Sequence, residues 1–347
     1  MNLPPYLDTL GIWTATIGLP EQIRGAVDSA CERLDVSAPL DGGTFDSVVV
    51  FGSGGSGTAA RLAAAYGDDH ATVPVHAVDD GVVPGFVGPH TLAVAASFPG
   101  ESEETTIAIM DARARGAQAV VVGGDGALRD WAVSDGITSF AIPDSLPVSR
   151  TALGALTVPI LLTMSRAGLT PDVMPSLAAA CEGLGRRRDV LMAPEGMAEV
   201  VARRIGRTIP LVYGSRGICA VAARRWKTQI NENAKTPAFF AVAPELSHNE
   251  VAGWGQHGDV TRQVFSLVAL RQNGERPEVA RRFDMVLAAT DEVMADVITV
   301  RAEGDDDLGR FFDFALFGDL VSLHLAGREG TDPGPVPAVD DASAGVP

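Results

Sequence analysis

The chain has 347 residues, 46% of them hydrophobic, so it can bury a full core and is long enough for two domains of ordinary size. Its 44 acidic residues outnumber the 27 Lys and Arg, and the net charge of −17 argues against nucleic acid or an anionic membrane surface as a partner. Three widely spaced cysteines without CxxC spacing argue against a disulfide framework or a zinc site, and favour a cytoplasmic protein. They are Cys31, Cys181 and Cys219.

The sequence carries no membrane signal. Its first residues, MNLPPYLDTLG, lack the basic segment and apolar core of a secretory signal. The longest apolar run, residues 153–164, is shorter than the ~20 residues of a membrane span and contains Pro159. We therefore expect no membrane partner.

The first half of the chain alternates between helix and strand patterns. Apolar positions at helical spacing over residues 7–35 predict two short helices, divided near Pro20. Short, nearly continuous apolar runs then predict strands that are buried on both faces, as in a parallel sheet. This alternation predicts a doubly wound α/β domain. The strands are expected at 47–51, 73–78, 91–96, 119–122 and 137–142, with helices at 58–66, 103–115 and 127–132.

The second half repeats this alternation after a mainly helical stretch over residues 150–205. Strands are expected from Ile209 and at 238–243, 265–271 and 296–301, with helices at 218–233, 278–290 and 307–326. The expected organisation is N-terminal helices plus a first domain (1–155), a helical connector (156–206), a second domain (207–330) and a tail rich in Pro, Gly and Asp (331–347), whose end we expect to be disordered.

The two halves share a turn motif that indicates an internal duplication. Residues 50–55 (VFGSGG) and 212–217 (VYGSRG) each place a Gly-Ser turn between an opening strand and a helix. We therefore expect two copies of one nucleotide- or sugar-binding topology in tandem.

The first of these turns, the glycine loop (residues 52–57), predicts an anion site. Gly52, Gly54 and Gly57 satisfy GxGxxG. Asp79 follows at the spacing of the carboxylate that binds the ribose in a dinucleotide site, so an oxidoreductase is one hypothesis. Hydroxyls in the same loop favour a phosphate held by backbone N–H groups at the helix N-terminus. A tight turn without a ligand is the third interpretation.

A second loop, residues 97–105, carries Ser97 and Ser102. Ser102 is expected to cap the following helix, with Glu103 and Glu104 in its first turn. Capping alone explains this acidic pair.

Residues 225–254 hold an unusual density of titratable side chains. A carboxylate and an imidazole in this stretch, such as Glu232 and His248, are suited to moving a proton between carbon atoms and between oxygen atoms. The alternative is a solvated helix end followed by an ordinary loop.

These segments together resemble the sugar isomerase (SIS) domain family, and more narrowly the bifunctional phosphoglucose/phosphomannose isomerases, which carry two SIS domains in one chain. The resemblance covers nearly the whole length, and the spacing of NENAK and ELSHNE is its most specific feature. It implies two tandem, flavodoxin-like SIS domains with parallel sheets. Its segments are 19–22, 52–57, 149–150, 231–235, 245–250, 317–319 and 332–333.

The resemblance implies isomerisation of a hexose 6-phosphate, glucose or mannose 6-phosphate to fructose 6-phosphate, through a cis-enediol and without metal or other cofactor. Glu232 would be the base, His248 would open the sugar ring across a homodimer interface, and Arg150 would stabilise the enediolate. The phosphate would be bound by Gly54, Gly55, Ser56, Ser97 and Ser102.

The sequence also departs from the family pattern. Where the family loop reads SxSGxT, this chain has Pro99 for the second Ser, Glu101 beside it and Ser102 for Thr. Gly334 replaces a threonine of the family's DPTPV, and a later family lysine aligns with Ala342 or Ser343. A sugar-phosphate-binding or regulatory protein with little or no turnover is therefore the alternative to an isomerase, beside the oxidoreductase hypothesis.

Overall fold

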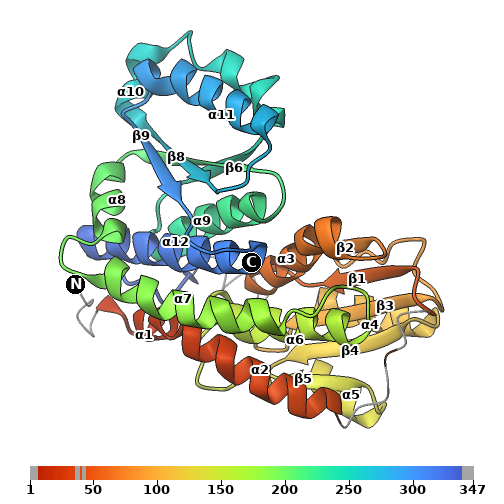
Figure 1. Ribbon diagram of the computed structural model, residues 1–347. Helices are drawn as coiled ribbons and strands as arrows, with labels where there is room; N and C mark the ends of the chain where they lie inside the picture. The colour runs from red at the N-terminus through yellow and green to blue at the C-terminus, as the bar shows by residue number, and fades with distance from the viewer. Residues whose placement is uncertain (1–6, 36–39, 41–43, 338–347) are drawn as a thin grey trace. The chain divides into compact units, whose positions relative to one another are not determined.

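The computed structural model describes residues 7–35, 40 and 44–337. Contacts divide the chain into two compact units. Residues 18–182 form the first unit, and residues 1–17 together with 183–347 form the second. Each unit contains one sheet, and helix α7 carries the chain from one unit to the other (Figure 1).

The first unit is built on a five-stranded parallel sheet with strand order β2-β1-β3-β4-β5. Every residue of β1 and β3 is buried, which explains their continuous apolar sequences. Its strands are β1 (Ser47–Phe51), β2 (Val75–Val78), β3 (Thr91–Ser97), β4 (Gln118–Gly123) and β5 (Thr138–Ala141).

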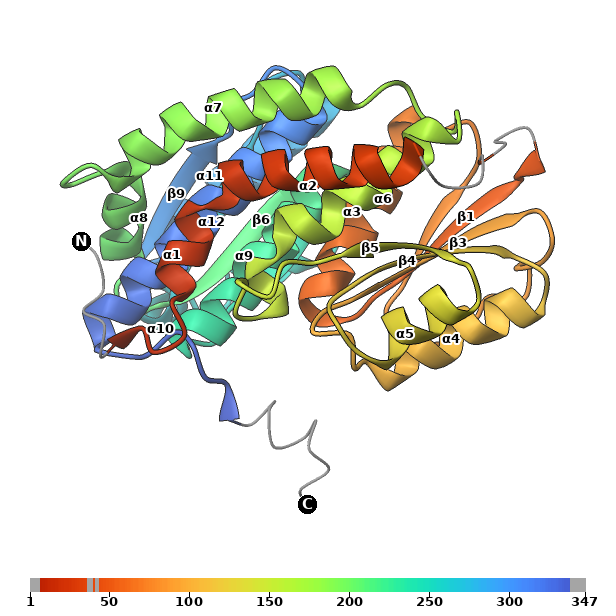
Figure 2. The same cartoon turned by 90° about the horizontal axis from the view of Figure 1, so that it is seen from below.

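Helices cover both faces of this sheet. Helices α4 and α5 pack on one face, where alanines of α4 meet the valines of β1 and β4. Helices α3 and α6 lie on the other face, and α2 packs against α6 (Figure 2). The helices are α2 (Leu19–Asp35), α3 (Gly54–His70), α4 (Glu103–Ala114), α5 (Ala127–Ser134), the 3₁₀ turn η3 (Ser149–Thr151), α6 (Leu153–Arg166) and α7 (Met174–Met192), which continues into the second unit.

The second unit repeats the topology with a four-stranded parallel sheet of order β7-β6-β8-β9. Helix α11 and the turn after β7 pack on one face. Helix α9 covers the other face and is itself covered by α12. The strands are β6 (Ile209–Ser215), β7 (Phe239–Ala243), β8 (Phe265–Arg271) and β9 (Asp296–Arg301). The helices are α1 (Ile12–Ile17), α8 (Met197–Ile205), α9 (Ile218–Ala234), α10 (Gly258–Val264), α11 (Pro277–Thr290) and α12 (Asp307–Glu329), with 3₁₀ turns η4 (Glu245–Ser247), η5 (Glu250–Gly253) and η6 (Asp291–Val293).

The contact between α9 and α12 combines polar and apolar packing. Arg225 and Asp319 form a buried two-bond ion pair, with N–O distances of 2.6 and 3.0 Å. The Trp226 indole donates to the Phe314 carbonyl at 2.7 Å. Gly318 lies beneath this indole, so the two helices approach closely at that point.

The predicted pair of doubly wound α/β domains is confirmed, and both sheets have the same order over four strands. Helix α3 begins at Gly54, four residues before the predicted start, so the glycine loop includes its first turn. Helix α10 was not predicted, because its seven residues contain no buried position that would create an apolar pattern.

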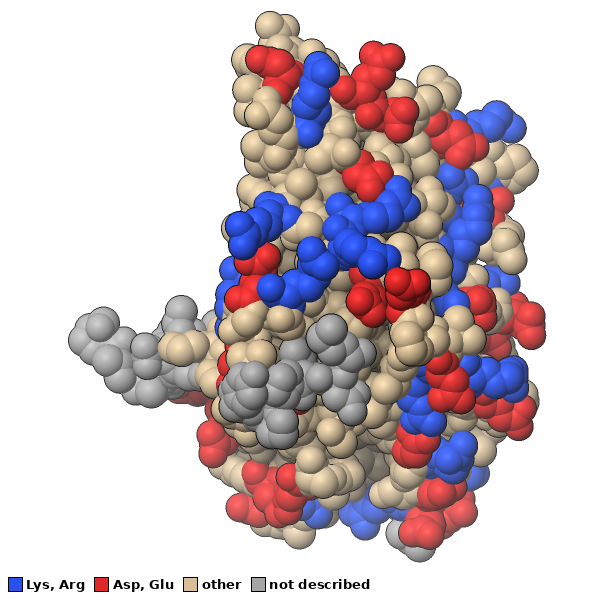
Figure 3. Space-filling view, turned by 90° about the vertical axis from the view of Figure 1, so that its left-hand side faces the viewer, with Lys and Arg blue, Asp and Glu red and all other residues tan. Residues whose placement is uncertain are grey.

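The segment expected as a connector is shared between the units, since residues 156–182 belong to the first and 183–206 to the second. The tail expected over 331–347 is described only to residue 337, so Ala342 and Ser343 lie outside the described residues. Within the described ranges, none of the helices combines the length and apolar character of a membrane span. On the face in Figure 3, basic and acidic side chains are interspersed, although the chain carries a net charge of −17.

We predict that Gly318→Ala destabilises the protein by about 2–3 kcal/mol, because its Cβ would lie 2.3 Å from the Trp226 indole nitrogen. Gly185→Ala, in helix α7 of the same unit, is the matched control: its Cβ would meet nothing within 4 Å. A stabilisation of up to about 1 kcal/mol is expected there. Urea unfolding followed by circular dichroism measures both effects, and equal effects of the two substitutions would contradict this packing.

Candidate active site

The glycine loop lies where the direction of chain winding reverses in the first sheet. The chain leaves β1 towards β2 and leaves β3 in the opposite direction, towards β4. In such sheets, ligands bind outside the carboxyl ends of the strands at this switch point. A Cβ on Gly52 would lie 3.2 Å from the Ala96 carbonyl oxygen, so the ends of β1 and β3 are in close contact.

Helix α3 begins at this switch point, and its first turn has no side-chain cap. Ser53 is the N-cap residue, and its side chain makes no capping hydrogen bond. Gly54 has a φ of +53°, which favours glycine, and Ser56 is buried in the first turn. This arrangement suits a phosphate group held by backbone N–H groups and the helix dipole.

Arg150 lies directly against the glycine loop. A Cβ on Gly55 would lie 2.6 Å from the Arg150 backbone nitrogen, so any larger residue at position 55 would displace the turn Ser149–Thr151. Arg150 itself is only 6% exposed. The structure therefore places Gly55 of the glycine loop against the Arg150 backbone.

The two predicted serines of the second loop also meet. Ser97, the last residue of β3, is buried, and its hydroxyl accepts a hydrogen bond from the Ser102 N–H at 3.4 Å. The predicted cap is confirmed, because the Ser102 hydroxyl accepts from the Thr105 N–H at 3.4 Å. Pro99 and Glu101, between the two serines, are both exposed.

Asp79, the residue of the dinucleotide hypothesis, is engaged by a cation. The Arg61 guanidinium binds its carboxylate at 2.8 Å. A ribose hydroxyl would have to compete with this ion pair, which weakens the oxidoreductase hypothesis.

The motif NENAK forms the C-terminal end of α9, and three of its residues hold the local structure. The Asn231 amide donates to the Thr236 carbonyl at 2.8 Å, and the buried Asn233 amide donates to the Ser322 hydroxyl of α12 at 2.9 Å. Lys235 ends the helix in the left-handed region, with its ammonium group on the Glu232 carbonyl. Glu232 itself is half-buried.

The segment Asp332–Gly334 lies next to this helix end. The Lys235 ammonium group also donates to the Pro333 carbonyl at 3.4 Å. The Asp332 carboxylate accepts from the Thr9 hydroxyl at 2.6 Å and from the Gly334 N–H at 2.8 Å. Two segments that are distant in sequence, and that both carry the family resemblance, therefore meet at the end of α9.

His248 lies in the loop that follows β7, and it is exposed. The Arg282 guanidinium of α11 donates to its Nε2 atom at 2.8 Å. An arginine only donates, so Nε2 is the acceptor in this contact. His248 and Arg282 line a pocket of about 340 Å³ whose apolar wall is formed by Val251, Met285 and Val286.

Glu232 and His248 lie at opposite ends of the parallel strands of the second sheet. Helix α9 runs back from the carboxyl end of β6 to the amino end of the parallel strand β7, whereas His248 follows the carboxyl end of β7. The five residues of β7 span roughly 16 Å. The fold of one chain therefore does not bring the predicted base and the predicted imidazole together.

A hydrogen-bond network anchors the histidine loop (residues 245–254). The Tyr213 hydroxyl of β6 donates to the Glu250 carboxylate and accepts from the Trp254 indole at 3.1 Å. Burial raises the pKa of Tyr213, and the neighbouring Glu250 carboxylate raises it further. The phenol therefore remains a donor that holds the loop on the core of the unit.

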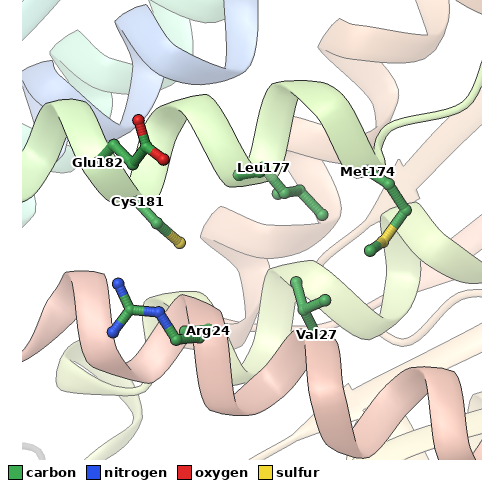
Figure 4. Close-up of a pocket in the computed structure, with 7 residues that line it drawn as sticks. Arg24, Val27, Met174, Leu177, Cys181 and Glu182 are labelled. Carbon is green, nitrogen blue, oxygen red and sulfur yellow. The ribbon is translucent and has the colours of Figure 1, made fainter.

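A separate pocket of about 190 Å³ lies between α2 and α7 of the first unit (Figure 4). The Cys181 thiol points into it, with Arg24 and Met174 at its sides. Burial raises the pKa of Cys181, an effect that the Arg24 guanidinium opposes. None of the residues predicted for the active site lines this pocket.

Sequence reasoning missed Tyr213 and Arg282, which contact the histidine loop from elsewhere in the chain. Tyr213 lies in an apolar strand, so the sequence pattern predicts a core residue at this position. Arg282 is one of two arginines in a charged helix segment, and nothing in the sequence singles it out. Among the described residues, no group of three or more His, Cys, Asp or Glu side chains is arranged to bind a metal ion.

Comparison with known proteins relates this geometry to a family. Residues 195–343 match the family described as bacterial phospho-glucose isomerase C-terminal SIS domain. A bifunctional phosphoglucose/phosphomannose isomerase of Caldicellulosiruptor bescii is 32% identical over 333 residues, which cover 95% of this chain and 97% of that protein. One from Thermoplasma acidophilum is 33% identical over 301 residues, covering 86% of this chain and 89% of that protein.

Solved structures show the same fold at low sequence identity. The C-terminal domain of glucosamine-fructose-6-phosphate aminotransferase from Francisella tularensis gives a TM-score of 0.68 at 16% identity. The similarity covers 92% of this chain and 96% of that one. At this identity, the comparison supports the fold alone.

We predict that Tyr213→Phe destabilises the protein by about 1–3 kcal/mol, because it leaves the Glu250 carboxylate without its phenol donor. Trp254→Phe is the matched variant: it removes only the indole donor, keeps the Tyr213–Glu250 bond, and should cost less. Urea unfolding gives the stabilities, and hydrogen–deuterium exchange should be faster in residues 245–254 of Tyr213→Phe. Wild-type exchange there would contradict the anchoring role.

Proposed function

The chain belongs to the family of bifunctional phosphoglucose/phosphomannose isomerases, and from this we propose that it interconverts glucose 6-phosphate and mannose 6-phosphate with fructose 6-phosphate. Both aldoses differ only at C2, and removal of the C2 proton gives the same planar cis-enediol. One base and one binding site therefore serve both substrates. The free thiols Cys31, Cys181 and Cys219 support a reducing compartment, which we take to be the cytoplasm.

The observation that carries the proposal is the close contact between the glycine loop and Arg150 at the first switch point. The N–H groups of Gly54, Gly55 and Ser56 hold the substrate phosphate, assisted by the hydroxyls of Ser97 and Ser102. Phosphate binding fixes one end of the sugar, so that its C1 and C2 atoms are presented in a defined orientation.

Glu232 is the base of the proposed reaction. Its carboxylate removes the proton from C2 of the aldose, and the electrons form the C1–C2 double bond of the enediolate. A proton passes from the O2 hydroxyl to O1, and the same carboxyl group returns the proton taken from C2 to C1, which gives the ketose. The bonds of Asn231, Asn233 and Lys235 support this role, because they hold the helix end that carries Glu232.

Arg150 stabilises the negative charge that develops on the enediolate oxygens. Its burial supports this role, because a charge shielded from water stabilises a nearby anion more strongly than an exposed one. The guanidinium of an arginine stays protonated in proteins, so it acts as a fixed positive charge.

His248 assists ring opening from a second copy of the chain. It lies at the opposite end of the strands from Glu232. The assembly that supports the chemistry is therefore a homodimer, in which each site combines Glu232 of one chain with His248 of the other. The exposure of His248 beside an apolar pocket is consistent with such an interface.

A protein that binds sugar phosphates without turnover is the second candidate. The departures at Pro99, Glu101 and Gly334 favour it, because they remove two hydroxyl groups and add a carboxylate near the phosphate loop. Deuterium exchange separates the two candidates. Thermal stabilisation by hexose 6-phosphates without exchange would support the binding protein.

We predict that the wild type incorporates deuterium at C2 of glucose 6-phosphate in heavy water and that Glu232→Gln lowers kcat about 10²- to 10⁴-fold. Thr228→Ser, one turn earlier in the same helix, keeps the hydroxyl that donates to the Arg225 carbonyl and serves as the control, with a much smaller effect on kcat. Nuclear magnetic resonance follows the exchange. A wild-type protein that binds the substrate without exchanging the proton would disprove the isomerase.

We predict that mixing Glu232→Gln and His248→Asn chains restores activity. In a random 1:1 mixture half of the dimers are mixed, and one of their two sites has both wild-type residues, so about a quarter of the wild-type activity should return. Each variant alone, unfolded and refolded in the same way, is the control. If the mixture is only as active as the average of its parents, each site is built from one chain.

A further inference from the structure

We propose that Gln22 is a positioning residue for Arg150: its side-chain amide holds the turn Ser149–Thr151 in the place where the Arg150 guanidinium meets the substrate. This inference rests on the proposed role of Arg150 in the isomerase reaction. Gln22 is in the first turn of α2, far from Arg150 in the sequence.

Gln22 bonds to both sides of the junction between the turn and helix α6. Its Nε2 atom donates to the Thr151 carbonyl at 2.8 Å. Its Oε1 atom accepts from the N–H groups of Gly154 at 2.6 Å and Ala155 at 3.1 Å. One side chain therefore fixes the last residue of the turn and the first residues of α6 together.

Helix α6 depends on this contact because it lacks a cap of its own. Its N-cap residue is Ala152, which has no side-chain acceptor for the unpaired N–H groups of the first turn. Gln22 supplies that acceptor from another helix. Gly154 permits the approach, since a Cβ there would lie 2.9 Å from the Ile23 side chain and 3.1 Å from Gln22 Oε1.

The glycine loop limits the turn from the other side. A Cβ on Gly55 would lie 2.6 Å from the Arg150 nitrogen and 2.6 Å from the Ser149 carbonyl carbon. The Arg150 backbone is thus confined between the phosphate-binding loop and the Gln22 amide. Loss of the amide releases one of these two restraints while leaving the glycine loop and its phosphate contacts in place.

The test compares two substitutions of Gln22. Gln22→Met preserves the length of the side chain and removes all three bonds. Gln22→Glu keeps the acceptor for Gly154 and Ala155, loses the donor to Thr151 and places a carboxylate oxygen near that carbonyl. We expect kcat for glucose 6-phosphate to fall about 10-fold or more in Gln22→Met and less in Gln22→Glu, because small misplacements of a catalytic group are costly. KM and the thermal shift by inorganic phosphate should change less than about 2-fold, since the phosphate loop is untouched.

A double-mutant cycle separates positioning from general stabilisation. On an Arg150→Met background, Gln22→Met should cause no further loss of kcat, because it acts through the guanidinium that is already absent. Arg33→Met is the matched control: it removes a 3.2 Å bond from the other end of α2 to the Ser139 carbonyl, and should lower stability while leaving kcat unchanged.

The outcomes distinguish this inference from the proposed function. A wild-type protein without turnover would disprove the isomerase proposal. The role of Gln22 in that reaction would then be disproved as well. Wild-type turnover that is unaffected by Gln22→Met, or losses that multiply independently on the Arg150→Met background, would disprove the role of Gln22 alone. Faster hydrogen–deuterium exchange of residues 149–155 in Gln22→Met, absent from Arg33→Met, is expected if the amide holds the turn.

Discussion

A helix that follows a strand of a parallel sheet must run back across the sheet before the next strand begins. This constraint determines which predicted residues one chain brings together. The glycine loop and Ser97 both lie at the carboxyl ends of strands of the first sheet. Helix α9 instead carries Glu232 to the amino ends of the strands of the second sheet, away from His248. In our proposal, the resulting separation is the physical reason for a homodimer.

The sequence predicts the strands well because strands buried on both faces leave continuous apolar runs, as β1 and β3 do. It predicts helix boundaries less well where other forces decide them. Helix α3 begins at Gly54, within a loop that glycines alone would place outside a helix, because the turn is packed between Ala96 and the backbone of Arg150. Such tertiary contacts leave no local pattern.

The candidate site likewise combines features that the sequence predicts with features that only the structure shows. NENAK is visible in the sequence as a dense group of polar residues, but only the structure assigns Asn231, Asn233 and Lys235 to holding the helix end. The partners of the other site residues lie far away in the chain, as Gln22 does from Gly154 and Arg282 does from His248. Composition and spacing carry no information about these pairs, because each depends on which helices pack together.

The departure at Gly334 shows that a substitution and its surroundings change together. The family threonine would need space that Leu10 occupies here, since a Cβ on Gly334 would lie 2.8 Å from Leu10 Cγ and 3.2 Å from the Asp332 carboxylate. Asp332 remains bound to Thr9, so the segment keeps its position without the threonine. The backbone next to the end of α9 is therefore retained without the threonine, so the departure at Gly334 leaves the support for the proposed base in place.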